Sequence, residues 1–319
     1  MERYAFFQSD HHIIMPLKIG PAEVGPWAKE KLDALQRYLD FYTKVFKNNK
    51  NYRTIYFDGF AGGGQAVLRR QNQQNINHYD LFDENTEAEE IEFIDGSPKI
   101  ALALQNPFDT YVFVDKDPNR VTELKQLSAL YEDGRKVIVR PNDCESEIEW
   151  LLEQNIKIAT HRGVAFLDPF GAHLPWNSVC SLGKTKLFEV IINLPLDMAI
   201  NRLLKRNNEI PVKWRDQLNS VFGEFDWHTE VYNEGPNLFE KTAVEKRSDA
   251  IKRLLQLYLK MLRSEFACVA KPKLIKNSKG HPLYYIIWAG QNSKGLLGAE
   301  YILGMSERLP TGPNSGRPN

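Results

Sequence analysis

The chain has 319 residues, enough for two average domains or one elaborated α/β domain. Apolar residues make up 42% and charged residues 26%, which excludes an intrinsically disordered or collagen-like chain. The 41 Lys and Arg residues balance 41 Asp and Glu residues, which excludes a uniformly basic nucleic-acid coat. No apolar run approaches the roughly 18 residues that a membrane helix needs, and the N-terminus lacks a signal-peptide pattern. We therefore expect a cytoplasmic protein without membrane contact.

Residues 1–26 are expected to form an N-terminal arm, because two Gly-Pro pairs interrupt regular structure there. A helix is predicted from Trp27 to Phe46, where apolar residues recur every three or four positions. Short β-branched and aromatic runs then alternate with helical stretches, the pattern of a mainly parallel sheet. Strands are predicted at residues 54–58, 111–114, 136–139, 164–167 and 189–194, with helices at 97–104, 118–131 and 146–154.

Later in the chain, strand-like runs at 266–270 and 283–289 flank a Lys-rich turn at 277–280 and are expected to close the sheet as a hairpin. The stretch before them reads as helices at 198–206, 213–221 and 244–263, which would form a substrate-recognition insertion. The predicted organisation is a Rossmann-like α/β domain with seven strands, made of residues 27–196 and 264–308. A helical insertion takes up residues 197–263, and residues 309–319 form a disordered tail.

A glycine cluster follows the first predicted strand, in the sequence Asp58-Gly-Phe-Ala-Gly-Gly-Gly64. Ligands of open α/β sheets bind beyond the carboxyl ends of the strands, and Gly62 and Gly64 let the backbone approach a ligand where a Cβ atom would collide. A dinucleotide site needs an acid about 20 residues after its glycines, whereas Asp115 follows Gly64 by 51 residues. A nucleotide-dependent oxidoreductase is therefore disfavoured.

Three acids, Asp58, Asp115 and Asp143, stand at or just after the ends of the first three strands. They suit a cofactor that carries an amino acid and an adenosine but no phosphate. One carboxylate would bind its ammonium group, one its ribose hydroxyls and one its adenine amine. S-adenosylmethionine is the cofactor that this pattern predicts, bound by these acids together with Gly62 and Gly64 in a class I methyltransferase fold. The alternative is a tight turn that binds no ligand.

The fourth strand leads into Asp168-Pro-Phe-Gly171, which resembles the D-P-P-Y motif of amino-directed nucleic-acid methyltransferases. The Asp168 carboxylate and the Pro169 carbonyl would accept hydrogen bonds from an exocyclic amine, while Phe170 would stack on the base. The match is imperfect, because Phe170 replaces the second proline and Gly171 the aromatic residue.

A second candidate for the same hydrogen bonds is Asn193-Leu-Pro-Leu196, after the fifth strand. For both segments the alternative is a proline-containing loop that only closes a strand. Cytosine-C5 methylation is excluded, because Cys144, Cys180 and Cys268 all lack the Pro-Cys pairing of that nucleophile. The spacing of these cysteines predicts neither disulfides nor a metal site.

The zero net charge conceals two opposite regions. Residues 71–95 contain eight acids and no Lys or Arg, whereas residues 241–279 contain eleven bases and three acids. The stretch from Lys241 to Lys279 is predicted to contact the phosphates of a nucleic acid. The alternative is an ordinary solvated surface.

Five short motifs follow one another along the chain: Gly25-Pro-Trp-Ala-Lys-Glu-Lys-Leu32, Tyr56-Phe-Asp-Gly-Phe-Ala-Gly62, Gly96-Ser-Pro-Lys-Ile-Ala-Leu102, Phe113-Val-Asp115 and Leu167-Asp-Pro-Phe-Gly171. They occur in the order found in the three-Cys-motif partner proteins, and the chain resembles that family over residues 25 to 305. The resemblance implies a class I methyltransferase-like fold and a cysteine-rich partner protein that resembles radical S-adenosylmethionine enzymes. It implies no particular reaction. Gly59 and Gly63 stand where relatives are expected to carry a larger apolar residue and a proline.

These observations predict S-adenosylmethionine-dependent methyl transfer, to an amino group of a nucleic acid, by a protein that acts with a partner. The alternative is a non-catalytic methyltransferase-like module that binds a cysteine-rich partner or a nucleic acid.

Overall fold

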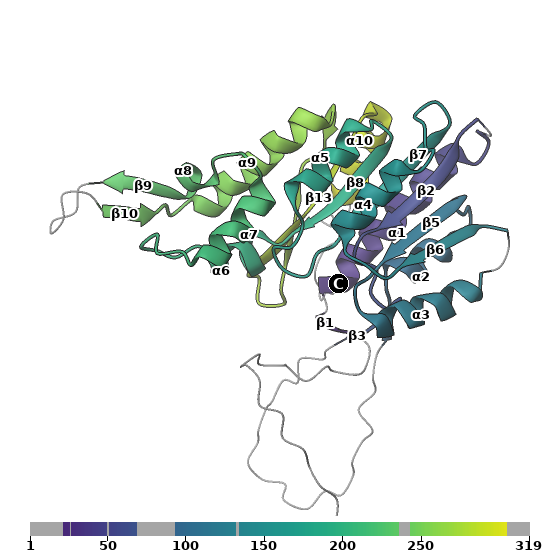
Figure 1. The fold of residues 1–319 in the computed structure, drawn as a ribbon, viewed down its shortest axis with the longest axis horizontal. Helices are drawn as coiled ribbons and strands as arrows, with labels where there is room; N and C mark the ends of the chain where they lie inside the picture. Colours follow the sequence, from purple (N-terminus) through teal and green to yellow (C-terminus); the bar gives the residue numbers. More distant parts are fainter. Residues whose placement is uncertain are drawn as a thin grey trace, which may run out of the picture.

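The computed structural model describes residues 22–25, 27–49, 51–68, 93–131, 134–235 and 243–304 (Figure 1). The predicted arm up to residue 21, the acidic run up to residue 92 and the predicted tail 309–319 lie outside the described residues. The elements are β1 (Ala22–Val24), α1 (Trp27–Phe46), β2 (Arg53–Asp58), β3 (Gln65–Leu68), β4 (Phe93–Asp95), α2 (Ser97–Leu102), β5 (Thr110–Val114), α3 (Pro118–Ala129), β6 (Lys136–Arg140), α4 (Cys144–Glu153), β7 (His161–Leu167), α5 (Trp176–Lys184), β8 (Phe188–Leu194), the π-helix η1 (Leu196–Ile200), α6 (Asn201–Leu203), α7 (Val212–Phe222), α8 (Trp227–Val231), β9 (Tyr232–Gly235), β10 (Ala243–Lys246), α9 (Ala250–Glu265), β11 (Cys268–Val269), β12 (Lys273–Lys276), β13 (Pro282–Gly290) and α10 (Ser293–Gly304).

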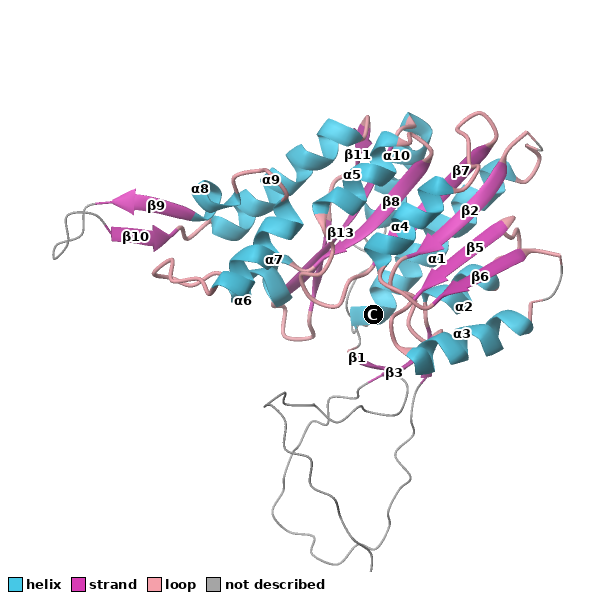
Figure 2. Ribbon diagram, in the orientation of Figure 1, coloured by secondary structure: helices cyan, strands magenta, loops and turns pink. Residues whose placement is uncertain are grey.

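A large sheet forms the centre of the molecule (Figure 2). Its strand order is β11-β13-β8-β7-β2-β5-β6, with β12 also paired to β13. The strands β2, β5, β6, β7 and β8 are parallel, and β13 runs antiparallel to β8. The parallel strands, numbered along the chain, therefore lie in the order 3-2-1-4-5, which is the Rossmann arrangement. The predicted Rossmann-like, mainly parallel α/β fold is confirmed.

Helices cover both faces of this sheet, and each central strand contributes to two apolar cores. On β2, Ile55 and Phe57 join the core covered by α4, α5, α7 and α9, whereas Tyr56 joins the core covered by α1, α2 and α10. Strands buried on both faces read as nearly continuous apolar runs. This double burial explains why the five parallel strands are recognisable in the sequence.

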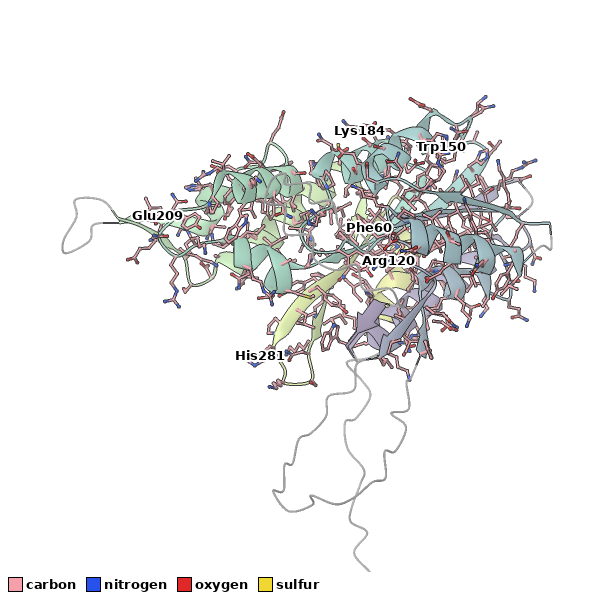
Figure 3. All side chains as sticks on the ribbon, turned by 60° about the horizontal axis from the view of Figure 1, so that its bottom comes forward. Phe60, Arg120, Trp150, Lys184, Glu209 and His281 are labelled. Atoms are coloured by element: carbon pink, nitrogen blue, oxygen red, sulfur yellow. The ribbon has the colours of Figure 1, made fainter. Side chains whose placement is uncertain are left out.

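The closing hairpin differs from the prediction in its first strand. The partner of β13 in the hairpin is β12, whereas the strand expected at 266–270 is reduced to β11, which pairs with the other end of β13. Pro272 lies between β11 and β12, and a proline has no N–H group to donate to a strand ladder. The turn is at the expected place, since Asn277 N donates to His281 O at 2.9 Å. His281 marks the tip of this hairpin in Figure 3.

The insertion at 197–263 is not wholly helical, which corrects the prediction. The helix expected from Val244 begins as β10, which pairs with β9 in an antiparallel ribbon far from the sheet (Figure 1). Helix α9 starts only at Ala250, after Ser248 and Asp249, residue types that favour the start of a helix. The expected helix at 198–206 is instead η1 followed by the single turn α6.

A small second sheet borders the carboxyl edge of the main sheet and was not predicted. In it β3, which follows the glycine cluster, pairs in parallel with β1 and antiparallel with β4. Gly96 N donates to Gly64 O at 2.8 Å and fastens the end of β4 to the glycine cluster. These strands have three or four residues, too few to show a period of two clearly.

A buried carboxyl group at the start of β8 makes folding sensitive to pH. The Tyr38 hydroxyl donates to Glu189 and accepts a hydrogen bond from Trp288 Nε1 at 2.6 Å. Burial raises the pKa of Glu189 from 4.5 to about 7. The folded protein therefore binds the proton of the Glu189 carboxyl more tightly than the unfolded chain does. The stabilisation of the folded state by this proton is complete below about pH 4.5 and is lost as the pH rises through about 7.

We expect Glu189→Gln to flatten the fall in melting temperature between about pH 5 and pH 8, because glutamine does not ionise. Thermal denaturation at several pH values checks this. Asp58, whose pKa burial also raises to about 7, contributes equally to both proteins, so the difference between the two curves isolates Glu189. Parallel curves for parent and variant would contradict the assignment.

Candidate functional site at the carboxyl edge of the sheet

The loop after β2 turns at two glycines in the left-handed region. Gly62 has φ +65° and Gly64 has φ +86°, values that side chains rarely permit. A Cβ atom on Gly62 would meet nothing within 4 Å, whereas one on Gly64 would lie 2.6 Å from Leu127 Cδ2. The backbone at Gly62 therefore faces open space, as a ligand-binding loop requires.

Asp115, the residue after β5, joins this loop to the next strand. Its Oδ2 accepts from Gly62 N at 2.9 Å and its Oδ1 accepts from Asp117 N at 2.8 Å. Arg120 Nη1 lies 3.7 Å from Oδ2. Asp115 is only 8% exposed, yet it lines a cavity. The carboxylate therefore fixes the loop and borders a binding space at the same time.

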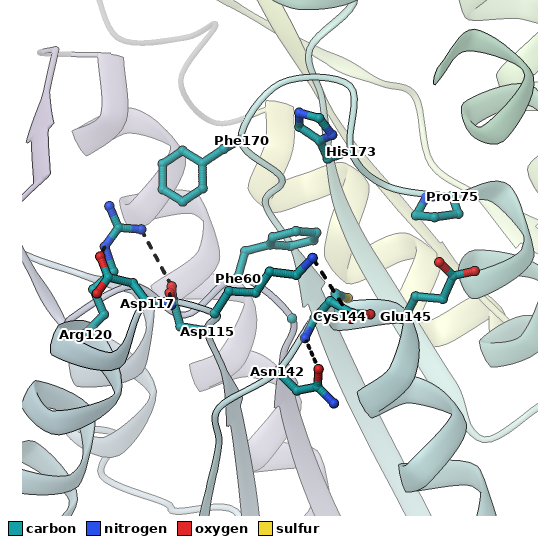
Figure 4. Close-up of a pocket in the computed structure, with 13 residues that line it drawn as sticks. Phe60, Asp115, Asp117, Arg120, Asn142, Cys144, Glu145, Phe170, His173 and Pro175 are labelled. Atoms are coloured by element: carbon teal, nitrogen blue, oxygen red, sulfur yellow. Dashed lines mark hydrogen bonds and ion pairs between the residues drawn. The ribbon is translucent and has the colours of Figure 1, made fainter. Parts of the chain in front are cut away.

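That cavity has a volume of about 560 Å³ and lies beyond the ends of β5 and β6 (Figure 4). Asp143 lines it and caps α4 by accepting from Ser146 N at 2.9 Å. The Ser146 N–H group and the nearby Lys116 ammonium hold the pKa of Asp143 below its usual value. The remaining walls are formed by Gly59, Phe60, Lys116, Asp117, Arg120, Asn142, Cys144, Glu145, Phe170, His173 and Pro175.

Asp58 occupies a different position from the other acids. It is fully buried and lines neither this cavity nor a second cavity that contains Asp168. Its carboxylate accepts from Phe60 N at 3.3 Å and from the Tyr56 hydroxyl at 3.2 Å. This corrects the sequence-based assignment of Asp58 to cofactor contact: as the last residue of a buried strand, it supports the glycine loop from beneath.

A second cavity of about 600 Å³ adjoins the first, and Phe60, Arg120 and Phe170 line both. Figure 3 shows Phe60 and Arg120 close together near the middle of the molecule. The second cavity extends from the glycine loop and the start of α1 to the ends of β7 and β8 and to η1. The chain thus forms two cavities with shared walls where a Rossmann-like sheet is expected to bind ligands.

Asp168 lies in the second cavity between two donors. Lys31 of α1 donates to Asp168 Oδ2, and Asn193 Nδ2 donates to Oδ1 at 2.6 Å. The Lys31 ammonium also lies 5.7 Å from the centre of the Tyr284 ring. The structure therefore brings together Asp168 and Asn193, which the sequence offered as separate candidates. Lys31 was missed, although it belongs to the motif Gly25–Leu32.

Phe170 stands at the junction of the two cavities, after the buried Pro169. Its ring is 60% exposed and lies 5.0 Å from the Arg120 guanidinium, a cation–π geometry. Gly171 follows with φ +73°, a backbone conformation that glycine permits, and it lines the second cavity. An exposed aromatic ring at this position is available for stacking against a flat ligand.

The predicted basic stretch does not form one continuous surface. Lys241 lies outside the described residues, Lys273 is 5% exposed and pairs with Glu30, and Arg253 pairs with Glu230. The exposed bases of α9 are Lys252, Lys260 and Arg263. Within the described ranges, no group of three His, Cys, Asp or Glu side chains is placed to hold a metal ion. No helix in that part of the chain combines the length and apolar character of a membrane span.

No family model and no curated protein matches the chain. Among solved structures, a Legionella pneumophila protein of the family DUF519 is 15% identical, with a TM-score of 0.39, over 81% of this chain and 97% of that chain. A Clostridium thermocellum protein, provisionally assigned as an rRNA methylase, is 10% identical, with a TM-score of 0.27, over 66% of this chain and 97% of that chain. The fold is assigned from the strand order, and these distant likenesses carry no functional argument.

The two loop glycines form a matched pair for mutation. Gly62→Ala should lower the free energy of unfolding by about 1–2 kcal/mol, because alanine is strained at positive φ. Gly64→Ala should lower it further, because its Cβ atom also meets Leu127. Urea denaturation followed by tryptophan fluorescence measures both changes. No loss in Gly64→Ala would contradict the loop geometry, whereas equal losses in the two variants would show that the Leu127 side chain moves aside.

Proposed function

We propose that this protein transfers a methyl group from S-adenosylmethionine to an amino group of a nucleic acid. The observation that carries the proposal is the pair of cavities at the carboxyl edge of the sheet that share Phe60, Arg120 and Phe170. One is bordered by the strand-end carboxylates Asp115 and Asp143, and the other contains Asp168. Their junction at Phe60 and Phe170 is where a cofactor and a methyl acceptor would meet.

The residues of the 560 Å³ cavity fit S-adenosylmethionine. Its volume falls within the roughly 300–1,000 Å³ of typical ligand pockets. Asp115 and Asp117 offer acceptors for ribose hydroxyls, and Asp143 offers an acceptor for the adenine amine. The open backbone at Gly62 lines the adjoining 600 Å³ cavity, and it would suit the amino-acid end of a cofactor that reaches past Phe60. Acids, and not a phosphate-binding loop, dominate the strand ends that border this space.

When bound, S-adenosylmethionine would supply an electrophilic methyl group: a nitrogen–carbon bond forms as the carbon–sulfur bond breaks, the electron pair of that bond returns to sulfur, and the methylated nitrogen then loses a proton to solvent. Asp168 would accept an N–H of the target amine and so aim the nitrogen lone pair at the methyl group. Lys31 holds the Asp168 carboxylate from the opposite side. Phe170 would stack on the base. The exposed α9 bases would contact phosphates.

A non-catalytic module is the second candidate, and one observation favours it. Both carboxylate oxygens of Asp168 already accept hydrogen bonds, from Lys31 and Asn193. A carboxylate has about four lone-pair sites, so these bonds leave room for an amine but are also sufficient for a purely structural role. Such a module would bind the cysteine-rich partner that the family resemblance implies.

Asp115→Ala should weaken S-adenosylmethionine binding about ten- to a hundredfold, because a hydrogen bond to a charged group is worth about 1.5–3 kcal/mol. Isothermal titration calorimetry measures the change. Asp226→Ala is the control: it likewise removes a carboxylate that accepts a backbone N–H, from Thr229 at 3.1 Å, but Asp226 lines neither cavity. Parental affinity in Asp115→Ala would remove that residue from the cofactor site.

Asp168→Ala should reduce the rate constant of methyl transfer and leave cofactor affinity nearly unchanged, because its interaction with the amine strengthens in the transition state. Phe170→Ala should instead raise the apparent KM, since base stacking is worth about 1–3 kcal/mol. Single-turnover assays on bulk DNA and RNA, with melting temperatures of the same samples, separate these effects. Unfolding of Asp168→Ala together with lost cofactor binding would show a structural role only.

A further inference from the structure

Asn193 has one hydrogen-bonding atom in use and one unused. Its Nδ2 donates to Asp168 Oδ1 at 2.6 Å, whereas its Oδ1 is buried and has no partner among the described residues. The residue is 6% exposed. The carboxylate fixes this orientation, because the flipped amide would place two oxygens against each other. Oδ1 is therefore a buried acceptor that lacks a donor.

A buried acceptor without a donor is unfavourable, and a native structure that keeps one calls for an explanation. The Ser178 hydroxyl and the Tyr258 hydroxyl are also buried without partners, but neither residue lines the two cavities of the site. Asn193 lines the cavity that contains Asp168. It is also followed closely by η1. Turns of π-helix are rare in proteins, but those that occur are often found at functional sites.

We propose that Asn193 Oδ1 accepts the second N–H of the target amine, the bond that the sequence motif would give to the carbonyl of Pro169. This inference rests on the proposed function. An exocyclic amine offers two N–H groups, of which Asp168 accepts one and Asn193 the other. A site built from acceptors rejects analogues that lack the donor. The methyl acceptor is therefore a base with an exocyclic amine, and uracil and hypoxanthine are excluded as substrates.

Asn193→Leu tests the inference, because leucine has a similar volume and no acceptor. Parent and variant are assayed with tritiated S-adenosylmethionine on poly(A), poly(C), poly(U) and poly(I). The parent should label poly(A) or poly(C) and neither of the others, and the variant should lose about ten- to a hundredfold in kcat/KM. Tyr258→Phe is the control: it removes a buried oxygen that also lacks a partner but lines neither cavity, and should keep the parental rate.

A second readout needs no turnover. Fluorescence anisotropy with S-adenosylhomocysteine present should show that the parent prefers oligo(A) to oligo(I), or oligo(C) to oligo(U), and that Asn193→Leu has lost this preference. Parental labelling and parental preference in the variant would overturn the inference and leave the proposed function intact. Weakened cofactor binding in the variant, with the preference retained, would assign Oδ1 to the cofactor ammonium and also overturn it. Failure of the parent to label any polymer would overturn both proposals.

Discussion

The hydrogen bond from Gly62 N to Asp115 Oδ2 connects the two parts of the site. It holds the loop after β2 against the end of β5, and the positive φ of Gly62 lets the backbone make that bond while it faces open space. Asp58 fixes the start of the same loop from beneath through Phe60 N. Because the loop borders the larger cavity and Asp115 the smaller, its position determines how the two spaces meet at Phe60.

Much of the main sheet could be predicted from the sequence, because its parallel strands are buried on both faces and appear as apolar runs that end in acids or glycines. The small sheet could not, since β1 and β3 are short and their pairing depends on chain segments brought together by the glycine loop. The first strand of the hairpin was misplaced because apolar content at 266–270 outweighed the effect of Pro272. The ribbon of β9 and β10 was missed because Val244 also fits the helical period of α9.

The sequence predicted where the strand-end acids lie, and not what their side chains contact. Asp115, Asp143 and Asp168 line the two cavities because parallel strands bring their carboxyl ends to one edge. The same rule placed Asp58 in the site, but it does not say which side chain points into the core. The contact between Lys31 and Asp168 spans 137 residues and depends on how α1 packs on the sheet, so no local pattern could reveal it. The family resemblance and its cysteine-rich partner remain predictions.

The central claim is that the acid-lined edge of this sheet binds an adenosine-containing cofactor without phosphate groups. Isothermal titration of the full chain with S-adenosylmethionine, NAD⁺ and ATP in parallel tests it most directly. The account predicts saturable binding of S-adenosylmethionine and none of the two phosphate-bearing nucleotides, because the carboxylates Asp115, Asp117, Asp143 and Glu145 outnumber the cations Lys116 and Arg120 in the 560 Å³ cavity. Binding of NAD⁺ or ATP with equal or higher affinity, or no binding of S-adenosylmethionine, would contradict it.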